Sequence, residues 1–206
     1  MNKGILCFLI CTTILRIFAL GLDEIIEKTI EKYENLISLY AEFEQILCDE
    51  LTGTCTNFEG KIYFLKPNSF RLEVKNPQQI YVGDSVSLWI YLPAENKARK
   101  QSFSQVPFQI NPDIFLKDYD KRFSVELTDD GEENYQITLT PIEETDIYKK
   151  IIVEINKEKY EINGITIFDE AGSENKFNFS KIEINRKLPK KLFEFTPPKG
   201  TQVDEY

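Results

Sequence analysis

The sequence of 206 residues contains no histidine, and this absence removes many kinds of catalytic site. A Ser-His-Asp triad, a Cys-His pair, an H-E-x-x-H zinc site and a C₂H₂ zinc finger all require it. Basic residues are also scarce, because 25 Lys and Arg stand against 34 Asp and Glu and the formal net charge is −9. Proteins that bind phosphate backbones usually carry a basic patch. We therefore expect neither histidine-based catalysis nor a nucleic-acid partner.

Long apolar runs are absent except at the N-terminus, where the sequence has the pattern of a secretory signal peptide. Lys3 gives a positive start, residues 5–15 are mostly apolar, and small residues occupy the −3 and −1 positions of a cleavage site after Gly21. The run is shorter than the roughly 20 residues of a membrane span, and an uncleaved anchor is the alternative. We expect a cleaved signal at 1–21 and one exported, soluble domain at 22–206.

Cysteine is used sparingly, with four residues in the chain. Cys7 and Cys11 fall within the predicted signal, and neither follows the small residue that a lipoprotein signal requires. Cys48 and Cys55 lie between two strand-like runs, and the six residues between them include Gly53. Such a segment can reverse the chain, so we expect a disulfide in an oxidising compartment. A redox or metal-binding pair is the rival interpretation.

Residues 23–37 have the spacing of an amphipathic helix. Apolar residues recur at intervals of three and four from Leu22 to Ile37, Asp23 is suited to the N-cap, and acidic residues occupy the first turn. We expect the apolar face of this helix to cover other elements.

From residue 38 onward the apolar period changes to two, which is typical of strands. Turn sequences with Pro, Gly, Asn and Asp separate the runs at short distances, which indicates an antiparallel barrel or sandwich. The pattern predicts a mainly β (α+β) protein of eleven strands, the first starting at residue 38 and the others at 58–65, 70–74, 79–82, 87–92, 98–102, 122–127, 135–139, 150–155, 161–168 and 176–184.

The segment 103–119 interrupts this rhythm with two prolines and many large apolar residues. It is too apolar for a plain surface loop of its length, and such inserts are often lids. Asn111 is suited to an N-cap and Pro112 to the first helical position, so we expect a short helix at 112–118.

An all-β shell that is apolar on both faces is either packed solid or hollowed by a ligand cavity. Only two helical segments are available to fill the inside, which favours a cavity with a removable cover. The acidic pairs fall in turns, and the chain has no Gly-rich phosphate loop. We therefore expect no catalytic residues, no cofactor and no metal.

A series of short motifs runs through the chain in order. They are Ala41-x-Phe43-x-Gln45, Gly60-x-Ile62-x-Phe64-x-Lys66-Pro67-Asn68-x-Phe70-Arg71, Gly83-Asp84-Ser85, Leu88-Trp89-Ile90-Tyr91-x-Pro93, Leu139-x-Pro141, Phe168-Asp169-x-x-Gly172, Asn185 and Phe193-x-Phe195-x-x-Pro198-x-Gly200. Together with the signal peptide, they resemble the bacterial outer-membrane lipoprotein carrier family, LolA, over nearly the whole of residues 22–206.

The resemblance implies an unclosed antiparallel β-barrel of about eleven strands with an N-terminal helix and a short helical lid. It also implies a monomeric periplasmic chaperone in lipoprotein transport and outer-membrane biogenesis. Such a protein takes acylated lipoproteins from an inner-membrane lipoprotein-releasing ABC transporter and passes them to an outer-membrane receptor, where one is present. Acyl chains cost about 0.8 kcal/mol per CH₂ to expose, so a soluble carrier must enclose them in apolar surface.

Roles for single residues follow from the same resemblance. Lys66 stands where the family commonly has Arg bonded to the lid; it keeps the charge but lacks the planar fork of donors, so we expect a weaker gate. Phe70 matches an aromatic at the cavity rim and is expected to contact cargo or a partner. The expected acyl-chain surface is Phe43, Phe64, Phe70, Leu72, Trp89, Phe108, Ile114, Phe115 and Leu116, the last four from the lid. A solvated Lys66, a core Phe70 and a Trp89 used only in packing are the alternatives.

A second hypothesis is a regulatory domain of the same half-barrel type that senses lipids or lipoproteins. Such regulators usually have a further domain or a membrane anchor, which this sequence does not indicate. An enzyme with paired carboxylates is a weaker third hypothesis, because no acidic pair falls on a predicted inner face.

Overall fold

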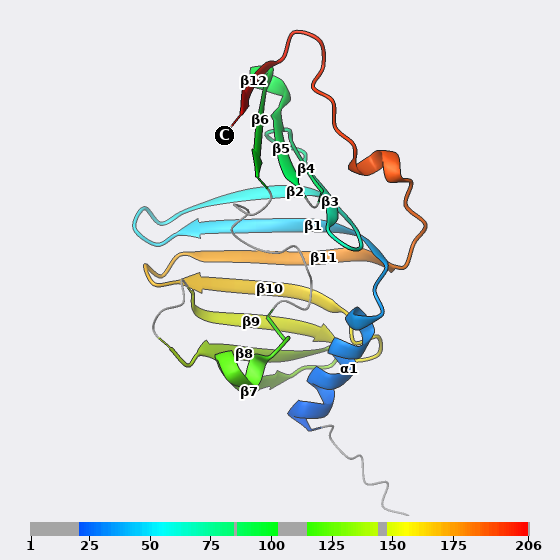
Figure 1. The fold of residues 1–206 in the computed structure, drawn as a ribbon. Helices are drawn as coiled ribbons and strands as arrows, with labels where there is room; N and C mark the ends of the chain where they lie inside the picture. The colour runs from blue at the N-terminus through cyan, green and yellow to red at the C-terminus, as the bar shows by residue number, and fades with distance from the viewer. Residues whose placement is uncertain (1–20, 85, 103–114, 144–147, 206) are drawn as a thin grey trace, which may run out of the picture.

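One open sheet of twelve strands dominates the protein in a computed structural model that describes residues 21–84, 86–102, 115–143 and 148–205 (Figure 1). The strands are β1 (Ser38–Asp49), β2 (Thr54–Leu65), β3 (Ser69–Val74), β4 (Gln79–Gly83), β5 (Ser87–Leu92), β6 (Lys97–Ser102), β7 (Phe123–Asp130), β8 (Asn134–Pro141), β9 (Tyr148–Asn156), β10 (Ile162–Asp169), β11 (Glu174–Ile184) and β12 (Gln202–Glu205). Their order is β12-β6-β5-β4-β3-β2-β1-β11-β10-β9-β8-β7, so the sheet ends at β12 and β7. This confirms the predicted mainly β, unclosed architecture.

All eleven predicted strands are present as β1 to β11, and their neighbours in the sheet pair antiparallel. The twelfth strand, β12, pairs parallel with β6 and was not predicted. It has only four residues, Gln202-Val-Asp-Glu205, and lacks the apolar alternation that signals a strand. Its partner strand, about 100 residues earlier in the chain, supplies the pairing.

Helix α1 (Leu22–Glu34) is shorter than the predicted helix 23–37. Its N-cap is Gly21, without a side-chain cap, so the prediction of Asp23 at that position was wrong. The helix ends early because the side chain of Asn185, which follows β11, binds a backbone N–H group that a longer helix would use. The Asn185 side-chain oxygen accepts a hydrogen bond from the Ile37 N–H at 2.7 Å, which turns the chain into β1.

The short helix predicted at 112–118 lies partly outside the described residues, which resume at residue 115. Residues 115–118 form turns, and helix α2 begins instead at Tyr119 and ends at Arg122. Asp118 precedes it with a left-handed backbone, φ 52°, which cannot continue a helix from the N-terminal side.

Helix α1 packs on one face of the sheet, which we call the inner face; the opposite face is the outer face (Figure 1). Its side chains Ile25, Ile26 and Tyr33 are buried in one cluster, and the Tyr33 hydroxyl accepts a hydrogen bond from the Ile162 N–H at 2.9 Å. Fully burying an aliphatic side chain contributes about 1.5–3 kcal/mol. The helix is therefore held mainly by its apolar face, as its sequence pattern predicts.

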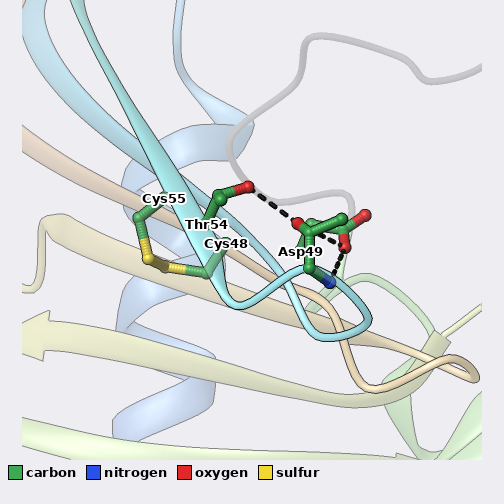
Figure 2. Close-up of a disulfide and its surroundings, with 5 residues drawn as sticks. Cys48, Asp49, Thr54 and Cys55 are labelled. Atoms are coloured by element: carbon green, nitrogen blue, oxygen red, sulfur yellow. Dashed lines mark hydrogen bonds between the residues drawn. A yellow bond between two sulfur atoms is a disulfide. The ribbon is translucent and has the colours of Figure 1, made fainter.

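The predicted disulfide joins Cys48 on β1 to Cys55 on β2, directly opposite each other in the register (Figure 2). The two Cα atoms are 4.1 Å apart. Beside it, the Asp49 carboxylate accepts hydrogen bonds from the N–H and hydroxyl of Thr52 at 2.8 and 2.9 Å. These bonds hold the pKa of Asp49 below its usual range. The hairpin turn is thus fixed by a covalent and a polar constraint.

The C-terminal segment, residues 186–205, passes beside β3 to β5 and ends next to β6 (Figure 1). Its short 3₁₀ helix, η3 (Lys190–Phe193), contacts β3. The ring of Phe195 lies 5.5 Å from that of Trp89 and 5.4 Å from that of Tyr91. The outer aromatic residues of β5 are therefore covered by the chain itself.

Candidate functional site

One row of apolar side chains crosses the inner face from strand to strand. Ile62, Leu72, Tyr81 and Ile90 are successive partners in the registers of β2, β3, β4 and β5. Direct partners share a face of the sheet, and Tyr81 and Ile90 pack against the same core cluster as α1. All four side chains are half-buried. We call them the transverse row.

The other half of the inner face differs, because it is packed solid. Under α1, the inward side chains of β8 and β9 are completely or almost completely buried: Ile137, Leu139, Ile151, Val153 and Ile155. This part of the sheet is a core rather than a binding surface. Apolar inner surface that stays partly accessible lies instead on the half formed by β1 to β5 and β11.

The environment of the transverse row is apolar enough to affect a titrating group within it. Burial raises the pKa of Tyr81 above its usual value. Its hydroxyl donates a hydrogen bond to the Gln79 side-chain oxygen at 2.6 Å, so the polar end of the ring has a partner. The row therefore offers apolar surface without an unsatisfied hydroxyl at its centre.

Three phenylalanines extend this surface to the middle of the sheet. Phe43 on β1 faces Phe179 on β11 in the register, and the Phe43 and Phe177 ring centroids are 6.3 Å apart. Phe177 and Phe179 stack with centroids 6.1 Å apart and planes 5° from parallel. Phe43 is buried, whereas Phe177 and Phe179 are half-buried. We call these three residues the aromatic cluster.

Two inner-face rings pack against glycines of the neighbouring strand. Phe43 is the register partner of Gly60, and Phe70 is the partner of Gly83. A Cβ atom at Gly60 would lie 2.6 Å from the Phe43 ring, and one at Gly83 would lie 2.2 Å from the Phe70 ring. Because glycine has no side chain, each ring can pack directly against the backbone of the neighbouring strand. The two rings therefore form the base of the inner-face surface.

The predicted acyl-chain residues separate into groups. Leu72 lies in the transverse row and Phe43 in the aromatic cluster. Phe64 and Phe70 belong to the buried core and are 8% and 3% exposed, so Phe70 is not at an accessible rim.

The predicted lid residues are described only in part, because Phe108 and Ile114 fall outside the described residues. Phe115 and Leu116 are buried in the core cluster. The ring of Phe115 meets that of Tyr148 edge-on, with centroids 5.8 Å apart.

Trp89 points away from the inner face. It follows Leu88, a core residue, so its side chain is on the opposite face of β5, where it contacts Phe195 and the Lys100 ammonium. The expected acyl-chain contact of Trp89 does not agree with this position, and the proposed surface leaves it out. The alternative of structural packing describes the observed contacts.

Lys66, the predicted gate residue, is exposed just after β2. Its ammonium donates a hydrogen bond to the Glu34 carbonyl oxygen at 2.7 Å. Glu34 is the last residue of α1, where a cation interacts favourably with the helix dipole. In this structure Lys66 therefore joins the end of α1 to the β2–β3 turn.

Sequence reasoning did not single out Tyr81, Ile90, Phe177 and Phe179 as functional residues. The signal was present, because Phe177 and Phe179 alternate within a correctly predicted strand, as do Leu88 and Ile90. What was missing was the identity of the inner face. Among the described residues, no cluster of Cys, Asp and Glu is arranged to hold a metal, and no helix is long and apolar enough to cross a membrane.

Comparison with known proteins places this geometry in context. Residues 34–196 match the family model described as outer membrane lipoprotein carrier protein LolA. Outer-membrane lipoprotein carrier proteins of Photobacterium profundum and Dechloromonas aromatica are 27% and 28% identical, over 80% and 82% of this chain and 81% and 82% of theirs. The fold is similar to that of an uncharacterized conserved protein from Thermus thermophilus, with a TM-score of 0.59, 13% identity and coverage of 89% and 98% of the two chains.

Proposed function

Because the chain belongs to the LolA family of outer membrane lipoprotein carrier proteins, we propose that it carries lipoproteins across the bacterial periplasm. Its cargo would be acylated lipoproteins released from the inner membrane by an ABC transporter and delivered to the outer membrane. The role needs a soluble, exported domain, which agrees with the proposed signal at 1–21. It requires no catalytic residue and no cofactor.

The observation that carries this proposal is the partly accessible apolar surface of the transverse row and the aromatic cluster. Acyl chains are stabilised by apolar surface in proportion to the area removed from water. On this sheet, the half under α1 is filled, while the other half presents half-buried Ile62, Leu72 and Tyr81. A lipid chain would therefore bind over β2 to β5 and β11.

Transfer without an energy source of its own follows from a difference in affinity. A carrier that holds acyl chains less tightly than the next acceptor releases them downhill. The half-buried state of the transverse row fits such intermediate affinity, because binding would remove only part of each side chain from water. A fully exposed row would gain more on binding but would be an aggregation liability in the empty protein.

The proposal is tested by a matched pair of variants on β2. Ile62→Asn places an amide in the transverse row, whereas Lys61→Asn makes a polar change on the opposite face of the same strand. We expect purified wild-type protein and Lys61→Asn to release a fluorescently tagged lipoprotein from inner-membrane vesicles, and Ile62→Asn to release at least fivefold less. Native mass spectrometry should detect the carrier–lipoprotein complex.

Circular dichroism and urea unfolding of both variants check that the fold is intact. Equal release by the two variants would contradict the assignment of the inner face. Failure of the wild-type protein to bind any lipoprotein or other acylated ligand would contradict the carrier function itself.

A further inference from the structure

The transverse row ends at a cation. Ile90 on β5 is the register partner of Arg99 on β6, so the Arg99 side chain continues the row on the inner face. Arg99 is exposed, in contrast to the half-buried apolar members of the row. At the other end the row meets Ala41 on β1, next to the buried Phe43. One end is thus polar and accessible, and the other is apolar and buried.

The length of the row matches that of a single lipid chain. Neighbouring strands are about 4.8 Å apart, so Ile62 and Arg99, which are four strands apart, are separated by about 19 Å along the sheet. One leaflet of a bilayer, which holds one acyl chain lengthwise, has about 15 Å of hydrocarbon. A single extended chain would therefore cover the apolar members of the row and bring its polar end to Arg99.

On this basis, which rests on the proposed carrier function, we propose that Arg99 binds the carbonyl oxygen at the head of an acyl chain lying across β2 to β5. The methyl end of the chain then points toward β1 and the aromatic cluster. The guanidinium of Arg99 donates hydrogen bonds to the ester or amide carbonyl, and no other charged group is needed on the ligand. The arrangement gives the surface a direction as well as an apolar character.

The neighbouring charges favour a neutral carbonyl over a free carboxylate. Asp204 on β12 is the register partner of Arg99, so the sheet places an acidic residue beside Arg99 on the same face. Lys97, two residues before Arg99, forms an ion pair with Glu95 at 3.6 Å. A neighbouring acidic residue weakens the binding of a full negative charge more than that of a neutral carbonyl, because the carbonyl oxygen carries only a partial charge.

Lys100 provides a matched control. It is adjacent to Arg99 in sequence but lies on the outer face, where its ammonium is 5.5 Å from the centre of the Trp89 ring. Replacing either residue by Ala removes one positive charge from β6 and leaves no side-chain donor at that position. Only Arg99→Ala removes a donor from the end of the transverse row.

The experiment compares two lipids that differ only in a carbonyl group. 1-Monopalmitoylglycerol has an ester, and 1-O-hexadecylglycerol has an ether at the same position. Each competes with the fluorescent probe N-phenyl-1-naphthylamine for the full mature protein. We expect wild type and Lys100→Ala to bind the ester about tenfold more tightly than the ether, the ratio that one charge-assisted hydrogen bond supplies. In Arg99→Ala the ratio should fall to about one, with ether binding unchanged.

A preference for the ester that persists in Arg99→Ala would overturn the proposal. Palmitate serves as a third ligand, and a loss confined to palmitate would likewise overturn it in favour of a carboxylate site. Failure of wild type to bind any of the lipids would instead contradict the carrier function, so the two failures are distinguishable.

The direction of the chain is tested by fluorescence quenching in a Trp89→Phe background. Ile90→Trp reports on the Arg99 end of the row and Ile62→Trp on the β1 end. We expect a bromine near the ester of the lipid to quench Ile90→Trp more strongly, and a bromine near the methyl end to quench Ile62→Trp more strongly. The reverse pattern would overturn the proposed direction.

Discussion

At the scale of single residues, Gly83 is a position where one methyl group has a structural cost. A Cβ there would lie 2.2 Å from the Phe70 ring, which is only 3% exposed and has little room to move. We expect Gly83→Ala to lower the free energy of unfolding by about 1–3 kcal/mol, as overpacking does in other cores. Urea denaturation measures this value.

Gly131 is the control for that prediction. A Cβ at Gly131 would be 3.4 Å from its nearest neighbour, the Asn134 carbonyl oxygen, and Gly131→Ala should change the free energy of unfolding by no more than about 0.5 kcal/mol. Equal effects of the two substitutions would show that the ring of Phe70 does not depend on the hollow at Gly83.

Tyr40, on the outer face of β1, gives a prediction for alkaline pH. Its pKa is raised to about 12, first because the ring is buried and then because its hydroxyl donates a hydrogen bond to Glu42. A tyrosine side chain in the unfolded chain has a pKa near 10. Between about pH 10 and 12 the unfolded chain therefore releases this proton first, and stability falls as the pH rises.

Tyr40→Phe removes this contribution from the pH dependence. We expect its free energy of unfolding, measured by urea denaturation at pH 9 and pH 11, to fall less over that interval than that of wild type. Glu42→Gln, which keeps an acceptor oxygen but loses the charge, should give an intermediate slope. Identical slopes for Tyr40→Phe and wild type would contradict the assignment.

At the scale of elements, the β1–β2 hairpin is held by two different constraints. The disulfide closes a short loop, for which the entropic contribution is about 2 kcal/mol. The Asp49–Thr52 hydrogen bonds fix the turn independently of it. We expect the double variant Cys48→Ser/Cys55→Ser to lose about 2 kcal/mol in urea denaturation and to keep its fold by circular dichroism.

Acyl-chain binding should be unaffected in that double variant, because the disulfide lies at the hairpin end of β1 and β2, away from Ile62 along the strand and on the outer face. Wild type under reducing conditions should match the variant in stability. A loss of lipid binding on reduction would mean that the hairpin, rather than the inner face, contributes to the binding surface.

At the scale of the whole molecule, the sheet has a filled half and a partly open half. Local stability follows the number of buried apolar contacts, so amide hydrogens of β8 and β9 should exchange most slowly and those of β4 and β5 much faster. Addition of 1-monopalmitoylglycerol should slow exchange in β2 to β5 and leave β8 and β9 nearly unchanged. Hydrogen exchange by mass spectrometry checks both statements, and uniform exchange would contradict the division.

The elements of this fold were largely predictable from local sequence. The alternation of apolar and polar residues that begins at residue 38 located all eleven strands β1 to β11. The turns between them fell where Pro, Gly and Asn occur. The errors came where distant residues act on the backbone. Asn185 ends α1 ahead of Ile37, and β6 creates β12 from a polar segment.

The candidate site was less predictable, because it depends on which face of the sheet is inside. Alternation determines that Leu88 and Trp89 point in opposite directions, but both are large and apolar, so local pattern does not assign the inner face. The packing of Phe195 on Trp89 decides this point.

The sequence by itself determined eleven of the twelve strands, the cysteine pair, the absence of histidine chemistry and the family. The tertiary structure alone decided which apolar residues are core, which form the transverse row, and that Arg99 stands at the end of this row. The physical reason is that strand formation depends on neighbours along the chain, whereas accessibility depends on what a helix or a C-terminal segment from elsewhere in the chain covers.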